Sequence, residues 1–345
     1  MVNPSSSGPR PTGAIRRLVT VAVSFACIAL GTACSPSPDK TGTGNGAKVR
    51  RIAVIPKGTT HEFWKSIHAG ALAAGRELGV EVLWQGPIKE DDRNAQIDVV
   101  ESFLAKKVDG IVIAPLDDKA LARPLREASE AGIPVVIIDS DVAWDGRKSF
   151  IATDNYKGGA LCADALATKL GGKGKVAMLR YIEGSASTEK RERGFLEGMA
   201  NNHPDIKIVS SNQRGGATTA SAVSASETLL GRFGDLQGVF CPNESVTFGM
   251  LRALQDSGKA GSIVLVGFDA SPKLVEGLAK REIEALAIQD PVKMGELGVR
   301  RIVDVLEGRD VPARIDTGVT LVTADSMKEP ANARLLDPDL SILDK

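Results

Sequence analysis

The sequence predicts an α/β fold in which two similar lobes are each built on a doubly wound parallel sheet. From Arg50 onward, short runs rich in β-branched residues alternate with longer amphipathic segments. The short runs are apolar throughout, which is typical of parallel strands buried on both faces. A chain of 345 residues is also long enough for two domains.

The predicted strands fall into two series. The first comprises 50–56, 80–86, 110–115, 134–140 and 149–154, and the second comprises 175–180, 206–213, 238–243, 263–269 and 284–290. Ten strands are more than one domain of this type needs, and the strands that end at Ser140 and Asp154 follow each other with no helix between them. We therefore expect the boundary between the lobes near Thr153.

Residues 1–33 have the features of a secretory signal. Arg10, Arg16 and Arg17 precede the apolar run 18–33, and residues 1–33 contain no acid. A basic start, an apolar core too short for a membrane span and an end of small residues are typical of an export signal. We expect a mature protein that leaves the cytoplasm.

Cys34 is the candidate lipidation site. The segment LGTAC that ends at Cys34 resembles a bacterial lipoprotein box, although Gly31 occupies the position that usually holds leucine. Cleavage after Ala33 by ordinary signal peptidase fits as well, because Gly31 and Ala33 are both small. We predict a lipid-anchored tether over 34–49, since the residues after Cys34 are polar and rich in glycine and serine.

Composition and motifs exclude several classes of function. The chain has 43 basic and 43 acidic residues, with no basic run beyond the N-terminus, so no nucleic-acid partner is expected. It lacks GxGxxG after the first predicted strand and GxxxxGK[ST] throughout, so we expect no nucleotide cofactor. We also expect no metal and no catalysis, because no ligand spacing and no set of nucleophile, base and orienting residue can be assembled. The histidines are interpreted as surface residues and two cysteines as buried thiols: His61, His68, His203, Cys162 and Cys241.

Polar residues end most of the predicted strands. In open parallel sheets, ligands bind beyond the carboxyl ends of the strands, so these residues are the candidates for a binding site. They are Lys57, Gln85, Pro115, Asp139 with Ser140, Asp154, Arg180, Gln213, Asn243, Asp269 and Gln289.

Phe63 and Trp64 are adjacent at the start of a predicted helix beside the first strand end. Neighbours on a helix point about 100° apart, so at most one ring can face the core squarely. Both rings could pack at the helix start, or one could form a platform for the C–H face of a sugar whose hydroxyls meet charged and amide groups.

Several segments in register resemble the periplasmic sugar-binding proteins of ABC importers, in the ribose and galactose group. The resemblance covers roughly 50–322 and rests on 63–71, 110–115, 131–141, 151–159, 190–195, 239–254, 266–272 and 287–291. It implies a type I periplasmic binding protein fold with three interlobe crossings near Thr153, Gln289 and Gly318. Lobe 1 would then comprise 50–153 and 290–318, and lobe 2 would comprise 154–289 and 319–330, before a polar C-terminal tail at 331–345.

The resemblance also implies a set of ligand-binding residues. The family's aromatic pair falls on Phe63 and Trp64, and an arginine of the second lobe falls near Glu189 or Arg191. The remaining family positions fall on Asp139, Asn243, Phe268, Asp269 and Gln289. Ser140 stands where the family has an arginine, and Ala217 stands where it has an aromatic residue. The segment IPKGTT together with WQGP looks more like the furanosyl autoinducer receptors, in which a lysine at the position of Lys57 touches the ligand.

The resemblance implies an exported receptor that closes its lobes on a small sugar or polyol and delivers it to an ABC permease. We expect a monomer in the periplasm or cell envelope, held at the membrane through its lipid anchor. A furanosyl autoinducer receptor of the same fold differs only in its ligand. A transcriptional effector domain would need a helix-turn-helix before the first strand, where residues 1–49 hold the export signal and tether instead.

Overall fold

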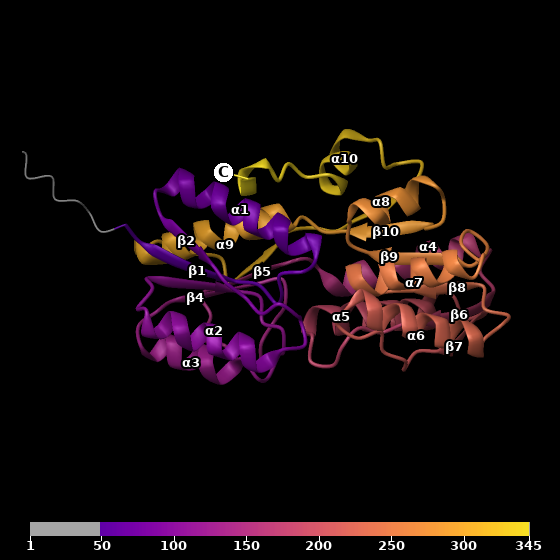
Figure 1. Ribbon diagram of the computed structural model, residues 1–345, viewed down its shortest axis with the longest axis horizontal. Coiled ribbons are helices and arrows are strands. Elements are labelled where there is room, and N and C mark those ends of the chain that lie inside the picture. The colour runs from indigo at the N-terminus through magenta and orange to yellow at the C-terminus, as the bar shows by residue number, and fades with distance from the viewer. Residues whose placement is uncertain (1–48, 345) are drawn as a thin grey trace, which may run out of the picture. The chain divides into compact units, whose positions relative to one another are not determined.

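The computed structural model describes residues 49–344, so the expected signal segment and Cys34 lie outside the described residues. The described chain forms two six-stranded sheets, each covered by helices on both faces (Figure 1). This arrangement confirms the predicted doubly wound α/β lobes.

The sheet of the first lobe is parallel throughout and has the strand order β11-β5-β4-β3-β1-β2. Its strands are β1 Arg51–Ile55, β2 Glu81–Trp84, β3 Gly110–Ile113, β4 Val135–Ile138, β5 Ser149–Ala152 and β11 Arg314–Asp316. One face packs against α1 Glu62–Leu78 and α9 Pro291–Leu306. The other face packs against α2 Arg93–Ala105 and α3 Ala122–Glu130.

The sheet of the second lobe repeats this order as β12-β10-β9-β8-β6-β7, with β12 antiparallel to β10. Its strands are β6 Gly174–Met178, β7 Ile206–Ser210, β8 Gly238–Phe240, β9 Val264–Phe268, β10 Ala285–Ile288 and β12 Thr320–Thr323. Helices α4 Asn155–Lys169 and α5 Ala186–Asn202 cover one face. Helices α6 Thr219–Arg232, α7 Glu244–Asp256 and α8 Pro272–Ala279 cover the other.

The chain passes between the lobes after β5, where Thr153 lies, after β10, where Gln289 lies, and between β11 and β12, where Gly318 lies. Two of these crossings touch, because the Thr153 hydroxyl donates to the Gly318 carbonyl at 3.2 Å.

The C-terminal segment departs from the expected polar tail. It contains α10 Pro330–Leu336, and Leu336 is buried in the core of the second lobe. The short 3₁₀ helix η1 Ser341–Asp344 then returns to α1, where Arg76 Nη2 donates to the Ile342 carbonyl at 3.4 Å. The burial of Leu336 gives the segment an apolar anchor, and the chain crosses between the lobes a fourth time.

Glycines allow the closest helix pairs to approach. A Cβ atom on Gly70 of α1 would lie 2.0 Å from the Val292 carbonyl oxygen of α9, and one on Gly295 would lie 2.0 Å from the Ile67 carbonyl oxygen. Gly159 of α4 meets the Arg191 carbonyl of α5 in the same way. Because a side chain would separate these helices, the glycines let α1 pack closely against α9, and α4 against α5.

Both cysteines in the described range, Cys162 and Cys241, are buried free thiols, as expected. Within residues 49–344, no helix combines the length and apolar character needed to cross a membrane.

Candidate functional site

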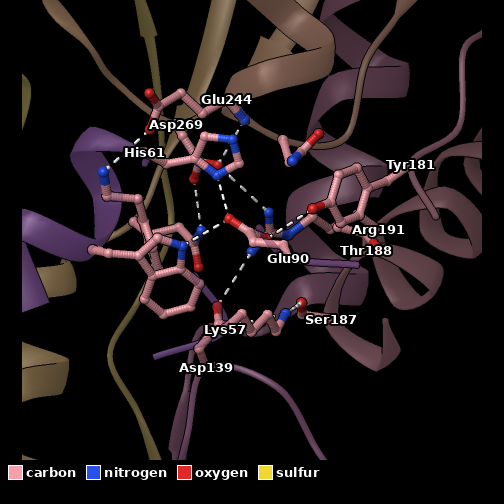
Figure 2. A pocket seen from close by; sticks show the side chains of 14 residues that line it. Lys57, His61, Glu90, Asp139, Tyr181, Ser187, Thr188, Arg191, Glu244 and Asp269 are labelled. Carbon is pink, nitrogen blue, oxygen red and sulfur yellow. Dashed lines mark hydrogen bonds and ion pairs between the residues drawn. The ribbon is translucent and has the colours of Figure 1, made fainter. Parts of the chain in front are cut away.

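A pocket lies where the carboxyl ends of the two sheets face each other (Figure 2). Both lobes contribute to its lining. The residues are Lys57, His61, Phe63, Trp64, Glu90, Asp139, Tyr181, Ser187, Thr188, Arg191, Asn243, Glu244, Asp269 and Gln289.

The structure brings most of the predicted site residues together here. The lining includes both aromatic residues of α1, Arg191 of α5 and the strand-end residues Lys57, Asp139, Asn243, Asp269 and Gln289. The other strand-end candidates are not among the lining residues: Gln85, Pro115, Asp154, Arg180 and Gln213.

Three further predicted residues, Ser140, Glu189 and Phe268, are not among the lining residues. The Ser140 hydroxyl accepts the Ser187 N–H at 3.1 Å, and the Glu189 carboxylate accepts the Gly184 N–H at 3.0 Å. Phe268 carries the Arg191 guanidinium 4.3 Å above its ring centroid. The structure therefore places Arg191, rather than Glu189, in the lining. Ser140, Glu189 and Phe268 instead contact lining residues or nearby loops.

Asp139 and Asp269 both have left-handed backbone conformations, with φ of 59° and 71°. Aspartate is one of the few residues besides glycine that adopts this conformation readily, and backbone strain of this kind clusters at functional sites. Each aspartate directly follows a buried strand, β4 or β9. The turn aims both carboxylates into the pocket.

Lys57 forms a buried ion pair with Asp139, with 2.8 Å between Nζ and Oδ2. The same ammonium group donates to the hydroxyls of Ser187 at 2.9 Å and Ser185 at 3.3 Å, which belong to the second lobe. Lys57 thus connects the lobes at the floor of the pocket.

Glu90, which follows β2, is the centre of a buried network that the sequence analysis did not include (Figure 2). Its carboxylate is ion-paired with His61 and accepts the Trp64 indole N–H at 2.7 Å and the Tyr181 hydroxyl at 2.8 Å. Burial alone would raise the pKa of Glu90, but His61, assisted by Lys57 and Trp64, lowers it to about 2. Glu90 is a carboxylate at neutral pH.

The expectation that His61 is a surface residue is wrong. Its side chain is buried beside Glu90 because the turn into α1 points it into the pocket. Burial would lower the pKa of His61, but Glu90 outweighs this effect and raises it to about 9. His61 and Glu90 therefore form a charged pair at neutral pH.

Both aromatic residues of α1 are buried, and both line the pocket. Phe63 and Trp64 pack edge to face, with ring centroids 5.0 Å apart, and both belong to the core cluster between α1 and the first sheet. Both rings therefore combine the two roles that helical geometry left open, because each packs in the core and each lines the pocket.

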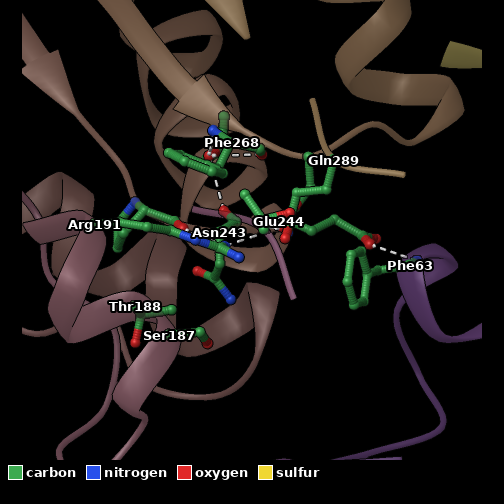
Figure 3. A network of polar contacts seen from close by, with 12 residues as sticks. Phe63, Ser187, Thr188, Arg191, Asn243, Glu244, Phe268 and Gln289 are labelled. Carbon is green, nitrogen blue, oxygen red and sulfur yellow. Dashed lines mark hydrogen bonds and ion pairs between the residues drawn. The ribbon is translucent and has the colours of Figure 1, made fainter. Parts of the chain in front are cut away.

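Arg191 is almost fully buried between the two aspartates. Its Nη2 lies 4.0 Å from Asp139 and its Nη1 lies 3.8 Å from Asp269. It donates to the Asn155 side chain at 2.7 Å and to the Pro242 carbonyl at 2.9 Å. These bonds and the Phe268 ring orient the guanidinium toward the pocket (Figure 3).

Gln289 presents an unsatisfied acceptor to the pocket. Its Nε2 donates to Asp269 Oδ1 at 2.7 Å, whereas its buried Oε1 has no hydrogen-bond partner among the described residues. A buried polar atom without a partner costs free energy that a ligand donor would recover.

The site residues that the sequence analysis missed are His61, Glu90, Tyr181, Ser187, Thr188 and Glu244. Every one lies in a connection from a strand to the next helix or in the first turn of that helix. The strand-end rule would have found them if it had been applied to the whole connection rather than to the last strand residue. Among residues 49–344, no group of three His, Cys, Asp or Glu side chains could hold a metal ion.

Comparison with known proteins agrees with this geometry. The family described as "Periplasmic binding protein domain" matches residues 52–310. The "Ribose import binding protein RbsB" of Bacillus subtilis is 28% identical over 313 residues, which cover 90% of this chain and 99% of the relative. The "D-allose-binding periplasmic protein" of Escherichia coli is 29% identical over 75% of this chain and 86% of its own length.

Solved structures have the same fold. A carbohydrate transporter solute binding protein from Agrobacterium radiobacter, in complex with D-arabinose, has a TM-score of 0.82 and 32% identity, over 84% of this chain and 99% of its own. An ABC transporter solute binding protein from Agrobacterium vitis, with bound D-fucose, has a TM-score of 0.80 and 36% identity, over 83% of this chain and 100% of its own. On the strength of the match over residues 52–310, this chain belongs to the periplasmic binding protein domain family.

Proposed function

We propose that this protein captures a neutral sugar or polyol between its lobes outside the cytoplasm and delivers it to an ABC importer. Its family and its relatives are substrate-binding transport proteins rather than enzymes. A ligand that touches both lobes binds the closed arrangement more tightly than an open one, so binding shifts the population toward closure.

The charges of the pocket favour a neutral ligand. Lys57 is paired with Asp139, His61 is paired with Glu90, and Arg191 lies between Asp139 and Asp269. A sugar acid, phosphate or amine would have to break one of these pairs, and leaving a buried charge without its partner is strongly unfavourable.

The single observation that carries the proposal is the missing hydrogen-bond partner of Gln289 Oε1 among the described residues. This buried acceptor needs a donor, and a sugar hydroxyl can donate to it while accepting from a neighbouring group such as Arg191. The rings of Phe63 and Trp64 supply the apolar surface that the C–H face of a sugar requires.

Location and assembly complete the proposal. The family implies a periplasmic location. We propose further that Cys34 carries the lipid anchor and that one copy of the chain is sufficient to bind the ligand, because both halves of the pocket come from a single chain.

A thermal-shift screen of the mature protein tests the proposal. The neutral panel holds D-arabinose, D-fucose, D-tagatose, D-ribose, D-allose and linear polyols, and gluconate and glucosamine are the charged controls. A ligand at 100 times its Kd adds about 2.7 kcal/mol of stability, which raises the unfolding temperature by several degrees. Stabilisation by the charged controls and by no neutral compound would overturn the proposal.

A further inference from the structure

Helix α1, which carries Phe63 and Trp64, begins without a side-chain cap from its own lobe. His61 occupies the N-cap position, and its side chain makes no capping hydrogen bond. The first N–H groups of a helix have no partner within the helix, so they need acceptors from elsewhere.

Glu244 supplies these acceptors from the opposite lobe. Its Oε1 accepts the Glu62 N–H at 3.2 Å, and its Oε2 accepts the Phe63 N–H at 3.1 Å. Figure 3 shows the carboxylate reaching from the second lobe to the start of α1 beside Phe63. An acidic group at this position also interacts favourably with the positive end of the helix dipole.

Glu244 is itself held in place by the interlobe region. It is the first residue of α7, and its N–H donates to Asp269 Oδ2 at 3.0 Å. Asp269 in turn accepts from Gln289, which lies at an interlobe crossing, at 2.7 Å. One chain of hydrogen bonds therefore runs from that crossing through Asp269 and Glu244 to α1.

We propose that Glu244 is a positioning residue for ligand binding, which caps α1 from across the cleft only when the lobes are closed. The cap holds the first turn of α1, and with it Phe63 and Trp64, against the pocket. The proposal rests on the proposed function only in that sugar binding requires closure. It gives Glu244 a role that needs no contact with the sugar.

Three variants test the cap. Glu244→Ala removes both acceptors, and Glu244→Gln keeps one. Glu62→Gln is the matched control, because it removes an acidic side chain from the same helix turn, where that side chain pairs with Lys65 at 2.8 Å. Urea unfolding of each variant shows whether it folds. We expect midpoints close to wild type, because Glu244 bonds to the other lobe rather than filling the core.

Amide hydrogen exchange over residues 58–67, followed by mass spectrometry, reads the cap directly. With a saturating sugar holding the lobes closed, we expect faster exchange of the Glu62 and Phe63 amides in Glu244→Ala, an intermediate rate in Glu244→Gln and the wild-type rate in Glu62→Gln. Equal exchange in wild type and Glu244→Ala would overturn the proposal. Equally fast exchange of these amides in Glu62→Gln would overturn the proposal too. The effect would then come from loss of a negative charge near the helix start rather than from loss of the cap.

Calorimetry adds the functional consequence. For a sugar that stabilises the wild type in the thermal-shift screen, with D-arabinose tried first, we expect about tenfold weaker binding to Glu244→Ala and unchanged binding to Glu62→Gln. Unchanged affinity in Glu244→Ala would overturn the positioning role. If no sugar binds the wild type, the proposed function fails, whereas slower exchange of the Glu62 and Phe63 amides in the empty wild type than in the empty Glu244→Ala variant would still support the cap.

Discussion

Asp139 and Asp269 occupy equivalent positions in the two lobes. Each follows the third strand of its sheet, counted from the edge strand β11 or β12, and each donates its N–H to the neighbouring strand at 3.0 Å. Arg191 lies between their carboxylates. The internal symmetry of the fold therefore places two carboxylates at one pocket, where both can interact with the Arg191 guanidinium and with the hydroxyls of a ligand.

Asp139→Asn and Asp269→Asn should each weaken sugar binding by about one to two decades in Kd. Asparagine keeps the shape and tolerates the left-handed backbone, but it loses charge-assisted hydrogen bonds worth roughly 1.5–3 kcal/mol. Calorimetry with a sugar from the screen measures the effect. Asp164→Asn, at an ion pair with His203 away from the pocket, is the control. Wild-type affinity in both pocket variants would remove these aspartates from the site.

Trp64→Ala should cost about 3–5 kcal/mol of unfolding free energy, because the ring is only 3% exposed and belongs to the core of the first lobe. It should weaken sugar binding as well, since the same ring borders the pocket and bonds to Glu90. Urea unfolding and calorimetry separate the two effects.

Trp84→Ala is the control for Trp64→Ala. Trp84 stacks on His68 with ring centroids 4.3 Å apart and is not among the lining residues. This variant should keep the wild-type affinity. If Trp64→Ala lost stability yet bound sugar as the wild type does, the ring would be purely structural.

Sugar affinity should rise about tenfold as the pH falls from 8 to 6. Burial raises the pKa of Glu244 from 4.5 to about 7 in the closed arrangement, although His61 and the Phe63 N–H oppose this rise. If the pKa is ordinary when the lobes are apart, closing takes up a proton, and lower pH favours closure. Calorimetry across this range measures the slope.

Glu244→Gln should flatten this pH profile. The titratable groups that face Glu244 are His61 and Asp269. The pKa of His61, at about 9, lies above the range, and the pKa of Asp269 is also raised by burial. A slope that survives in Glu244→Gln and disappears in Asp269→Asn would assign the proton to Asp269 instead.

Cys34→Ser should release the protein from the membrane fraction and leave its sugar affinity unchanged. The lipid would be attached to Cys34, which is separated from the first strand by the tether. Fractionation of cells that express each form measures the effect. Continued membrane association of Cys34→Ser would disprove the anchor.

The interior of the fold could be predicted from sequence because its strands are continuous apolar runs. All ten predicted runs form strands, β1 to β10. The runs that became β11 and β12 were not predicted. Both are short edge strands, and Arg314 and Asp316 are exposed, so the apolar signal of a buried strand is missing.

The site could be predicted only where a residue directly ends a strand or matches the family. Asp139 and Asp269 are such residues, because strand direction alone aims them at the pocket. Glu90 and Tyr181 do not end a strand, so only a search of each whole connection would have included them. Which side chain of a connection reaches the pocket depends on contacts with the opposite lobe, such as the hydrogen bond between these two side chains. No periodic pattern within one lobe records that contact.

Arg50, which leads into β1, pairs with Glu307 at 3.0 Å, and Ile342 near the other end contacts α1. Both ends of the described chain are therefore attached to the first lobe (Figure 1). Fluorophores fused at the two ends would move as one body and give no energy-transfer signal when a sugar binds. A reporter of binding needs one of its dyes on an exposed residue of the second lobe, such as Arg232 of α6.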